Sequence, residues 1–415
     1  MVTGLVRRAL SAPGDEYVFR PCRDWQPRFD PGDDCGLYIH VPFCRNACPY
    51  CPYNTVPWDP ALVPGFVAAL KAEMGRYREK VGRRRFSSLY IGGGTPTLIA
   101  AGLAGVLDEM RRLFELDGPV AIETGPGDVT ASRIGELRSL GVDYVSLGVQ
   151  SFNDRHLATI GRSHGGVEAA RAAELLVSAG FRVVNLDLIF ALPGQTEDEL
   201  VADLAAAVAL GAGQVTCYPL FTFPYSTVGR FKRLRRLRMP PGATRRRMYY
   251  RLSGFLRESG YRRSSVWGFI RPGSAAYSSV TRDYYLGFGP GAVSYDGHSF
   301  SFNTFPLGEY TRAARAGLPT ALRMEVTDRM RELFWFYWRL YEAEVPARAG
   351  LSRPLVELVR LLGLLGLVRR EGDRLALNDR GAHWVHLAQN HFALNYVSRV
   401  WSACLARPWP GAIRL

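Results

Sequence analysis

Short apolar segments alternate with longer amphipathic segments through the first half of the chain. The apolar runs have strand length and lie near residues 37–41, 88–91, 120–123, 144–147, 183–189 and 214–218. Segments with helical spacing lie between them, at 63–81, 103–114, 131–140, 167–179 and 197–210. Strands that alternate with helices of this length predict a parallel sheet. Six such units are too few for an eight-stranded barrel, so we expect an open, partial (β/α)6 barrel with functional residues at the carboxyl ends of its strands.

The rest of the 415-residue chain divides into three further parts around this predicted barrel at 35–225. Residues 1–34 contain four prolines and no sustained periodicity, which predicts an irregular N-terminal arm. Residues 226–320 begin as an arginine-rich linker and continue as a Gly/Tyr/Ser-rich stretch, which we expect to extend the core and form a lid. Residues 321–415 predict a smaller, helical, winged-helix-like C-terminal domain. The predicted fold class is therefore α/β.

The net charge of +14 comes mainly from runs of arginine. Such runs attract nucleic acid, anionic lipid or acidic substrates, but a solvated basic surface explains them as well. No combination of basic and aromatic residues matches a nucleic-acid-binding module. No segment has the apolar core of a signal peptide or 18 uncharged apolar residues in a row. We therefore expect a cytoplasmic protein that has no nucleic-acid or membrane partner and holds its seven cysteines as thiols or metal ligands.

Three of these cysteines, Cys44, Cys48 and Cys51, are close together in the segment YIHVPFCRNACPYC at 38–51. Three thiolates in one loop can bind three irons of a cuboidal cluster and leave the fourth iron open to another ligand. A zinc site would normally need a fourth Cys or His, and Pro52 follows where an adjacent ligand would stand. Three unrelated buried thiols are the alternative, although the Pro, Tyr and Asn between them have little core character. The spacing predicts a [4Fe–4S] site.

This loop resembles the signature of the radical S-adenosylmethionine (SAM) proteins. Residues 38–44 resemble in particular the oxygen-independent coproporphyrinogen oxidase-like (HemN-like) branch. The likeness continues in family order from about residue 35 to residue 300, through residues 92–97 (GGGTPT), Glu123, 148–153 (GVQSFN), Arg162, 185–196 (NLDLIFALPGQT) and 287–292 (GFGPGA).

The resemblance implies a [4Fe–4S] cluster and two SAM molecules. The predicted metal ligands, also the predicted catalytic residues, are Cys44, Cys48 and Cys51. In the family, residues that match Tyr38 and Glu123 lie against the SAM on the cluster, and residues that match Gln150, Arg162 and Asp187 hold a second SAM. The full set of predicted cofactor-binding residues is Tyr38, Gly93, Gly94, Thr95, Glu123, Gln150, Arg162, Asp187 and Ala292. A structural salt bridge is the alternative role for Asp187.

Two departures from the family pattern shape the functional hypothesis. Coproporphyrinogen dehydrogenases usually have a fourth cysteine two residues beyond the third, where this chain has Tyr53. Haem-chaperone relatives have His-Asn near a later Tyr-Trp pair, where this chain reads TRDYY at 281–285. The resemblance then favours the subgroup of HemN-like methyltransferases and cyclopropanases. The predicted activity is generation of a 5′-deoxyadenosyl radical and transfer of a SAM-derived methylene to an sp2 carbon in natural-product biosynthesis, as C-methylation or cyclopropanation.

Two other functions stay open at this point. One is the decarboxylation of a porphyrinogen propionate by a coproporphyrinogen III dehydrogenase-type enzyme, and the other is haem binding and delivery without catalysis. For the enzyme we expect a small-molecule or peptide substrate, an electron donor such as flavodoxin or ferredoxin, and an accessory methyltransferase as a further candidate partner.

Overall fold

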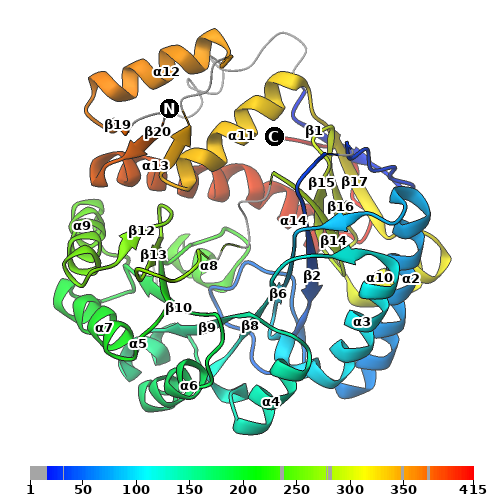
Figure 1. The fold of residues 1–415 in the computed structure, drawn as a ribbon, viewed down its shortest axis with the longest axis horizontal. Coiled ribbons are helices and arrows are strands. Elements are labelled where there is room, and N and C mark those ends of the chain that lie inside the picture. Colours follow the sequence, from blue (N-terminus) through cyan, green and yellow to red (C-terminus); the bar gives the residue numbers. More distant parts are fainter. Residues whose placement is uncertain are drawn as a thin grey trace.

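One mixed sheet of 14 strands organises the part of the chain that the computed structural model describes (Figure 1). That part comprises residues 16–30, 32–233, 238–276, 278, 283–346, 350–371 and 374–415. The strand order is β12-β13-β11-β10-β9-β8-β6-β2-β14-β15-β16-β17-β1-β21. None of the helices in these described residues is long and apolar enough to span a membrane.

The parallel half of the sheet forms the predicted partial (β/α)6 barrel. Its six strands are β2 (Cys35–Val41), β6 (Ser88–Gly93), β8 (Val120–Thr124), β9 (Tyr144–Gln150), β10 (Val183–Phe190) and β11 (Gln214–Pro219). The helices are α2 (Val63–Val81), α3 (Ala100–Leu113), α4 (Ala131–Ser139), α5 (Asp154–Thr159), α6 (Gly166–Ser178), α7 (Glu197–Ala209), α8 (Thr227–Arg233) and α9 (Gly242–Glu258). Most of these helices lie along the outside of the sheet in Figure 1. The α/β class and the alternation predicted from periodicity are confirmed.

A second, antiparallel half continues the sheet beyond β2. Strand β14 (Tyr284–Phe288) pairs in parallel with β2, and the strands after it pair antiparallel. These are β15 (Val293–Tyr295), β16 (Ser299–Asn303), β17 (Thr320–Glu325), β1 (Val18–Pro21) and β21 (Ile413–Arg414). The shorter remaining elements are α10 (Leu307–Ala316), β12 (Arg262–Arg263), β13 (Gly268–Ile270), β5 (Arg85–Phe86) and β7 (Glu115–Leu116).

Strand β1 corrects one expectation, because residues 1–34 were expected to form an irregular arm. Residues 1–15 and 31 lie outside the described residues, but Val18–Pro21 pairs with both β17 and β21. Both partners are more than 290 positions away in the sequence, so local periodicity gives no sign of this strand. The predicted boundaries at 34/35, 225/226 and 320/321 stay predictions, and the sheet runs across all three.

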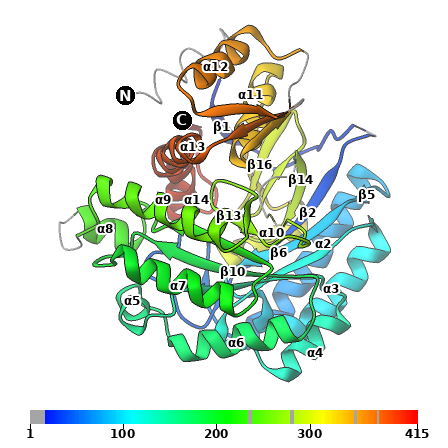
Figure 2. The same cartoon turned by 60° about the vertical axis from the view of Figure 1, so that its left-hand side comes forward.

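The C-terminal helices lie over the open end of the barrel (Figures 1 and 2). The elements are α11 (Asp328–Tyr341), β18 (Glu344–Pro346), α12 (Arg353–Leu364), β19 (Val368–Glu371), β20 (Arg374–Leu377), α13 (Asp379–Phe392), a π-helical segment (Ala393–Val397) and α14 (Ser398–Ala406). Helix α13 joins the barrel through His386, whose Nδ1 accepts a hydrogen bond of 3.1 Å from Trp267 Nε1 and whose ring stacks on Tyr249. Aromatic packing therefore fixes the cover on the barrel.

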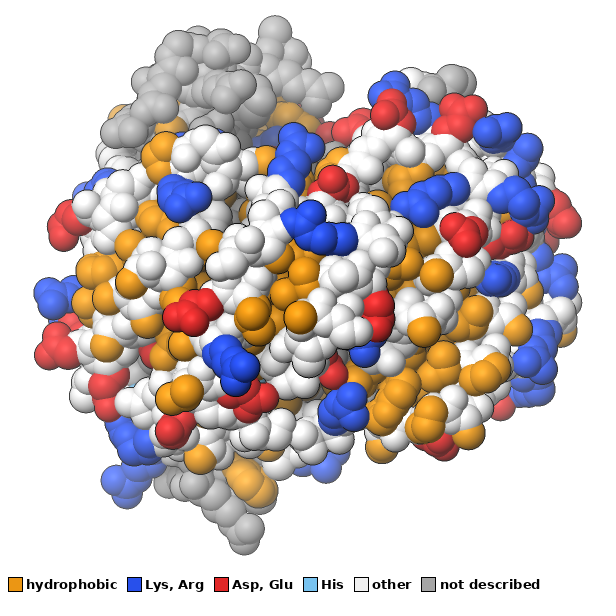
Figure 3. Space-filling model, turned by 60° about the horizontal axis from the view of Figure 1, so that its bottom comes forward, with side chains coloured by type: hydrophobic (Ala, Val, Ile, Leu, Met, Phe, Trp, Pro, Cys, Tyr) orange, Lys and Arg blue, Asp and Glu red, His pale blue; other side chains and the backbone are white. Residues whose placement is uncertain are grey.

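Charged side chains of both signs are interspersed on the face shown in Figure 3. Many arginines have acidic neighbours, as in the pair of Arg247 with Glu197, which join α9 and α7. Exposed pairs of this kind contribute about 0–1 kcal/mol each. This face has the mixed charge of a solvated surface.

A buried carboxyl joins the two halves of the sheet. Glu73 of α2 is 0% exposed and accepts hydrogen bonds from Gly289 N at 3.0 Å, Asn303 Nδ2 at 2.6 Å and the Tyr310 hydroxyl at 2.6 Å. Burial raises its pKa to about 7, against the effect of these three donors. The carboxyl thus ties the barrel to the end of β14, to β16 and to α10.

Replacing Glu73 with Leu should destabilise the protein strongly, because three buried donors lose their acceptor. Each unpaired donor costs about 1–3 kcal/mol, so we expect the free energy of unfolding to fall by about 3 kcal/mol or more. Urea titration followed by circular dichroism measures this loss. Glu79→Leu, at an exposed position of the same helix, should have little effect; equal losses in the two variants would contradict the role given to Glu73.

Candidate functional site

The carboxyl ends of the parallel strands and the C-terminal helices line one cavity of about 1740 Å³. The register of the sheet determines which side chains face it. Three adjacent strands each have a single residue that is not buried. It is Glu123 in β8, Gly148 in β9 and Asp187 in β10. Gly148 lies opposite Asp187, and Glu123 lies opposite Ser146. These positions therefore share the inner face of the barrel, and all of them line the cavity.

The cysteine loop lies at the mouth of the barrel, directly after β2. Its ends are held together because β3 (Phe43–Cys44) pairs with β4 (Val56–Pro57). Within the loop, the Cys51 amide donates to the Cys48 carbonyl at 3.0 Å. All three predicted cluster cysteines are half-buried and line the cavity. Burial raises the pKa of Cys44 to about 11 and that of Cys51 to about 12.

These cysteines fit a cluster better than a single ion. Within the described residues, no three His, Cys, Asp or Glu side chains form a group that could hold one metal ion. A cuboidal cluster has a different requirement, because each thiolate binds a different iron. Burial disfavours the free thiolates of Cys44 and Cys51, and coordinated iron would supply the compensating positive charge. The donor set and its placement at the cavity wall thus fit a [4Fe–4S] cluster.

The glycine run after β6 lies against the backbone that carries Cys44. The Gly94 amide donates to the Val41 carbonyl at 2.8 Å, and the Thr95 amide donates to the Phe43 carbonyl at 2.7 Å. A Cβ on Gly94 would lie 2.4 Å from the Phe43 carbonyl oxygen and 2.9 Å from Cys44 Sγ. Only glycine fits this approach. Gly93, Gly94 and Thr95 also line the cavity, next to the cysteine loop.

Glu123 is partly buried and presents its carboxyl to the cavity, where two donors among the described residues bond to it. The Tyr90 hydroxyl donates to its Oε1 at 2.5 Å, and the Gly93 amide donates to its Oε2 at 3.0 Å. Burial raises its pKa to about 7; the Tyr90 hydrogen bond opposes this and the negative charge of Asp187 reinforces it. This carboxyl can therefore change charge near neutral pH, and as a carboxylate it would attract a cationic ligand.

Asp187 is held by neutral neighbours on the inner face. Its carboxylate accepts hydrogen bonds of 2.7 Å from Ser146 Oγ and 2.8 Å from Asn185 Nδ2. Asn185 Oδ1 in turn accepts a hydrogen bond from Thr216 Oγ1 at 2.8 Å. Burial raises the pKa of Asp187. The ion pairs found in the described part of the chain do not include Asp187, so its alternative role in a structural salt bridge is not observed.

Arg162 and Gln150 meet at the end of β9. Arg162 Nη2 donates to the Gly148 carbonyl at 2.9 Å, and its Nη1 lies 3.4 Å from Cys48 Sγ. Gln150 ends the strand with a φ of 69°. A Cβ on Gly148 would lie 2.9 Å from Gln150 Nε2 and 3.7 Å from Arg162 Nη2. The glycine therefore makes room for both side chains between the strand end and the cysteine loop.

Two predicted cofactor-binding residues are not part of the cavity wall. The Tyr38 hydroxyl donates to His40 Nδ1 at 3.0 Å, and His40 Nε2 donates to the Asn54 carbonyl at 2.8 Å. Burial lowers the pKa of His40 to about 4, so the ring is neutral. Ala292 is 2% exposed and does not line the cavity, although the next residue, Val293, does. The other ten predicted residues all lie on the wall.

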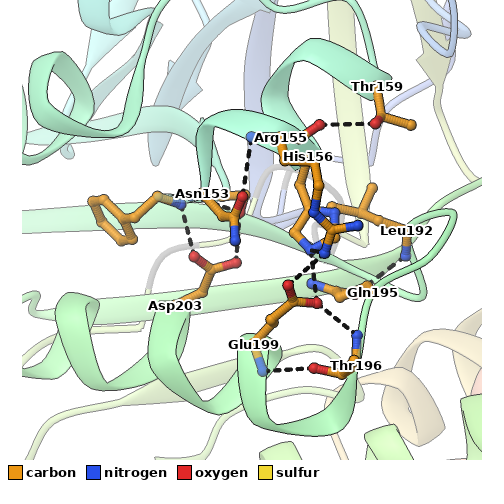
Figure 4. A network of polar contacts seen from close by, with 11 residues as sticks. Asn153, Arg155, His156, Thr159, Leu192, Gln195, Thr196, Glu199 and Asp203 are labelled. Atoms are coloured by element: carbon orange, nitrogen blue, oxygen red, sulfur yellow. Dashed lines mark hydrogen bonds and ion pairs between the residues drawn. The ribbon is translucent and has the colours of Figure 1, made fainter.

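A network of polar contacts supports the loop that follows Gln150 (Figure 4). Asp203 of α7 accepts hydrogen bonds of 2.7 Å from both Ser151 Oγ and the Phe152 amide. On the same helix, Glu199 accepts from the Thr196 amide in a capping box and contacts His156 Nε2 at 3.1 Å. Sequence reasoning missed Asp203, because an acidic residue at helical spacing looks like a surface residue.

Removing the Asp203 carboxylate should loosen this loop. In Asp203→Ala, we expect hydrogen exchange of the Phe152 amide to accelerate about tenfold or more, since a hydrogen bond to a charged group contributes roughly 1.5–3 kcal/mol. Hydrogen–deuterium exchange with peptide mass spectrometry reports on residues 150–153. Asp198→Ala on the exposed face of α7 is the control. Unchanged exchange in Asp203→Ala would show that Asp203 does not hold the loop.

Sequence reasoning did not identify the side chains of the opposite cavity wall as site residues. Helices α11, α13 and α14 contribute mainly aromatic and aliphatic side chains to it, among them Phe334, Tyr337, Trp338, Trp384, Phe392, Tyr396 and Trp401. The helical spacing of several of these residues is visible in the sequence but is equally typical of an ordinary core. The cavity therefore joins a polar half at the barrel mouth to an aromatic half under the C-terminal helices.

The family model described as "Radical SAM superfamily" matches residues 38–207. "Heme chaperone HemW" of Mycobacterium tuberculosis is 34% identical over 366 residues, which cover 85% of this chain and 93% of the relative. "Oxygen-independent coproporphyrinogen III oxidase" of Bradyrhizobium diazoefficiens is 29% identical and covers 86% of both. The solved structure "Coproporphyrinogen III oxidase (HemN) from Escherichia coli is a Radical SAM enzyme" superposes with a TM-score of 0.74 at 22% identity, over 87% of this chain and 90% of that one.

These relatives contradict the predicted methyltransferase or cyclopropanase activity. HemW relatives from M. tuberculosis, Bacillus subtilis and Escherichia coli match at 30–34% identity over 70–85% of the chain, and their printed names describe haem chaperones. The prediction depended on short motif differences, including residues 281–285, of which 281 and 282 lie outside the described residues. Similarity over more than 290 residues outweighs a difference of a few positions. The haem-binding alternative fits these relatives better.

Proposed function

The chain belongs to the HemN-like family of radical SAM proteins, and from that premise we propose that it binds haem and delivers it to other proteins. The observation that best supports this proposal is the size of the cavity, together with its division into a polar half and an aromatic half. At about 1740 Å³, it exceeds the roughly 300–1,000 Å³ of a typical small-molecule site. The polar half suits a charged nucleoside cofactor, and the aromatic half suits a flat, apolar ligand such as haem.

Family membership implies a [4Fe–4S] cluster and SAM. We propose that Cys44, Cys48 and Cys51 hold the cluster, which supplies electrons for reductive SAM chemistry when bound. Glu123 would then attract the positively charged end of SAM from the neighbouring wall. An electron donor of the flavodoxin or ferredoxin type would serve such a cluster.

A second SAM molecule is part of the same proposal. Arg162 reaches the cavity from the end of β9 and suits a carboxylate, and Asp187 suits ribose hydroxyls. In the sequence, Gln150 lies between Gly148, whose carbonyl accepts a hydrogen bond from Arg162, and Phe152, whose amide donates to Asp203. These three residues would orient the second molecule. The Asp187 carboxylate accepts its hydrogen bonds from neutral groups, which leaves its charge for the ligand, and Arg162, whose Nη1 lies 3.4 Å from Cys48 Sγ, would bind the ligand carboxylate beside the cysteine loop.

The aromatic half has side chains that ligate haem iron in other proteins. His391 of α13 lines the cavity, and its Nδ1 contacts Asn395 Nδ2 at 3.3 Å. We propose that haem enters this half as cargo, while the cysteine loop at the other half holds the cluster. Cluster and haem then occupy separate parts of the wall.

Haem binding and cluster binding should therefore be separable. The anaerobically reconstituted protein should bind about one haem per chain in a titration followed by the Soret band. Cys48→Ala should lose the cluster absorbance and keep haem binding, because Cys48 lies in the polar half. Cys22→Ala, outside the cavity wall, should keep both. A wild-type protein that binds no haem would contradict the proposed function.

Coproporphyrinogen oxidation is the second candidate, favoured by the relative of that name at 29% identity. Tyr53 stands where the dehydrogenases usually have a fourth cysteine, and its ring lies 6.0 Å from that of Trp401. Incubation of the reconstituted protein with coproporphyrinogen III and SAM distinguishes the two functions. Release of carbon dioxide would favour the oxidase, whereas haem binding without carbon dioxide favours the proposed carrier.

Binding of SAM should depend on pH through Glu123. Its pKa is raised to about 7, so the carboxyl is neutral below that pH and negatively charged above it. We expect SAM to bind more tightly as the pH rises from 6 to 8.5, measured by equilibrium dialysis. Glu123→Gln should bind about tenfold more weakly at pH 8, equivalent to about 1.4 kcal/mol, and lose the pH dependence. Glu79→Gln should behave like wild type; persistence of the pH dependence in Glu123→Gln would assign it elsewhere.

A further inference from the structure

Gln389 of α13 is a buried polar side chain that lacks hydrogen-bond partners in the described structure. It is 3% exposed and lines the cavity. Neither its amide oxygen nor its amide nitrogen has a partner among the described residues. Buried polar groups in native proteins are almost always hydrogen-bonded, and an unpaired one lowers stability. A residue that carries this cost at a cavity wall is expected to have a partner in the ligand.

Trp338 of α11 shows the same pattern on the facing helix. Its Nε1 is buried and has no acceptor among the described residues, and its side chain lines the same cavity. The ring is fixed by edge contacts with Phe334 and Tyr341, at centroid distances of 5.9 and 5.5 Å. Indole nitrogen is a donor only, and the Gln389 amide supplies two more donors and an acceptor. Helices α11 and α13 are in contact, and both unpaired groups belong to residues of the same cavity wall.

The surroundings of this pair define the chemistry of its ligand. The neighbouring wall consists largely of rings, from Phe334, Tyr337, Trp384, Phe392, Tyr396 and Trp401. The π-helical segment Ala393–Val397 directly follows α13 and contributes to the same wall; such segments are frequent at functional sites. Arg380, at the start of α13, adds an exposed cation to the wall. A planar apolar molecule with an anionic edge matches this combination.

Resting on the proposed function, we propose that Trp338 Nε1 and the Gln389 amide bind a propionate carboxylate of haem in the aromatic half of the cavity. The propionates are the peripheral polar groups of haem, and a carboxylate accepts hydrogen bonds from both donors at once. Charge-assisted hydrogen bonds of this kind are roughly twice as strong as neutral ones. The pair thereby orients the macrocycle relative to α11 and α13, whose rings pack against its faces.

The test compares haemin with its dimethyl ester, which keeps the macrocycle but lacks the carboxylates. Wild type should prefer haemin. Gln389→Leu and Trp338→Phe should each weaken haemin binding about tenfold or more and leave binding of the ester unchanged, so that the preference disappears. Gln26→Leu, at an exposed position outside the cavity wall, is the matched control and should retain the preference.

Stability without ligand distinguishes a ligand-binding role from a structural one. Gln389→Leu removes an unpaired buried amide, so the ligand-free variant should unfold at the same or a higher temperature than wild type. A structural Gln389 would instead give a less stable variant that binds both haemin and the ester poorly. That result, or unchanged haemin binding in both variants, would overturn the inference. Wild-type protein that bound neither compound would instead show the failure of the proposed function itself.

Discussion

Parallel pairing of β2 with β6 on one side and β14 on the other determines where the functional groups of this protein lie. Parallel strands all end at the same edge of a sheet, so whatever follows β2, β6 and β9 must meet there. The cysteine loop follows β2, the glycine run ends β6, and Gln150 ends β9. The close contact of Gly94 with the Phe43 carbonyl results from this pairing. The backbone next to the cysteine loop thus requires glycine at positions 93 and 94, as much as any ligand does.

The barrel and its polar wall could be predicted from sequence because both depend on local patterns. Apolar runs mark strands that are buried on both faces, and the carboxyl-end rule then places Glu123 and Asp187 at the site. The strand Val18–Pro21 could not be predicted, since its pairing depends on residues from the far end of the chain. The aromatic wall could not be predicted either, because ring spacing along α11 and α13 looks the same for a core and for a cavity. The predicted methyltransferase or cyclopropanase activity is wrong because it depends on two short motif differences, whereas the likeness to the HemW relatives extends over 70–85% of the chain.

Burial affects two glutamates of this structure in the same way, but their hydrogen bonds separate their roles. The pKa values of Glu73 and Glu123 both rise to about 7 because both are desolvated. Glu73 accepts three hydrogen bonds from three different elements and does not reach the cavity. Glu123 accepts two and lines the wall. A raised pKa therefore shows only that a carboxyl is desolvated. Glu123 differs from Glu73 because it lies on the cavity wall and can accept further hydrogen bonds, so it is available to a ligand.

The same reasoning applies more strongly to the C-terminal helices. Asp203 and Glu73 lie away from the cavity wall, and hydrogen-bond donors pair with both of their buried carboxylates. Gln389 and Trp338 Nε1 have no partner among the described residues, and both residues lie on the wall of one cavity. Leucine at 389 would pack against aromatic neighbours without the cost of an unpaired amide. Retention of an amide there is best explained by a ligand that pairs with it, and the aromatic rings around it require that ligand to be largely flat and apolar.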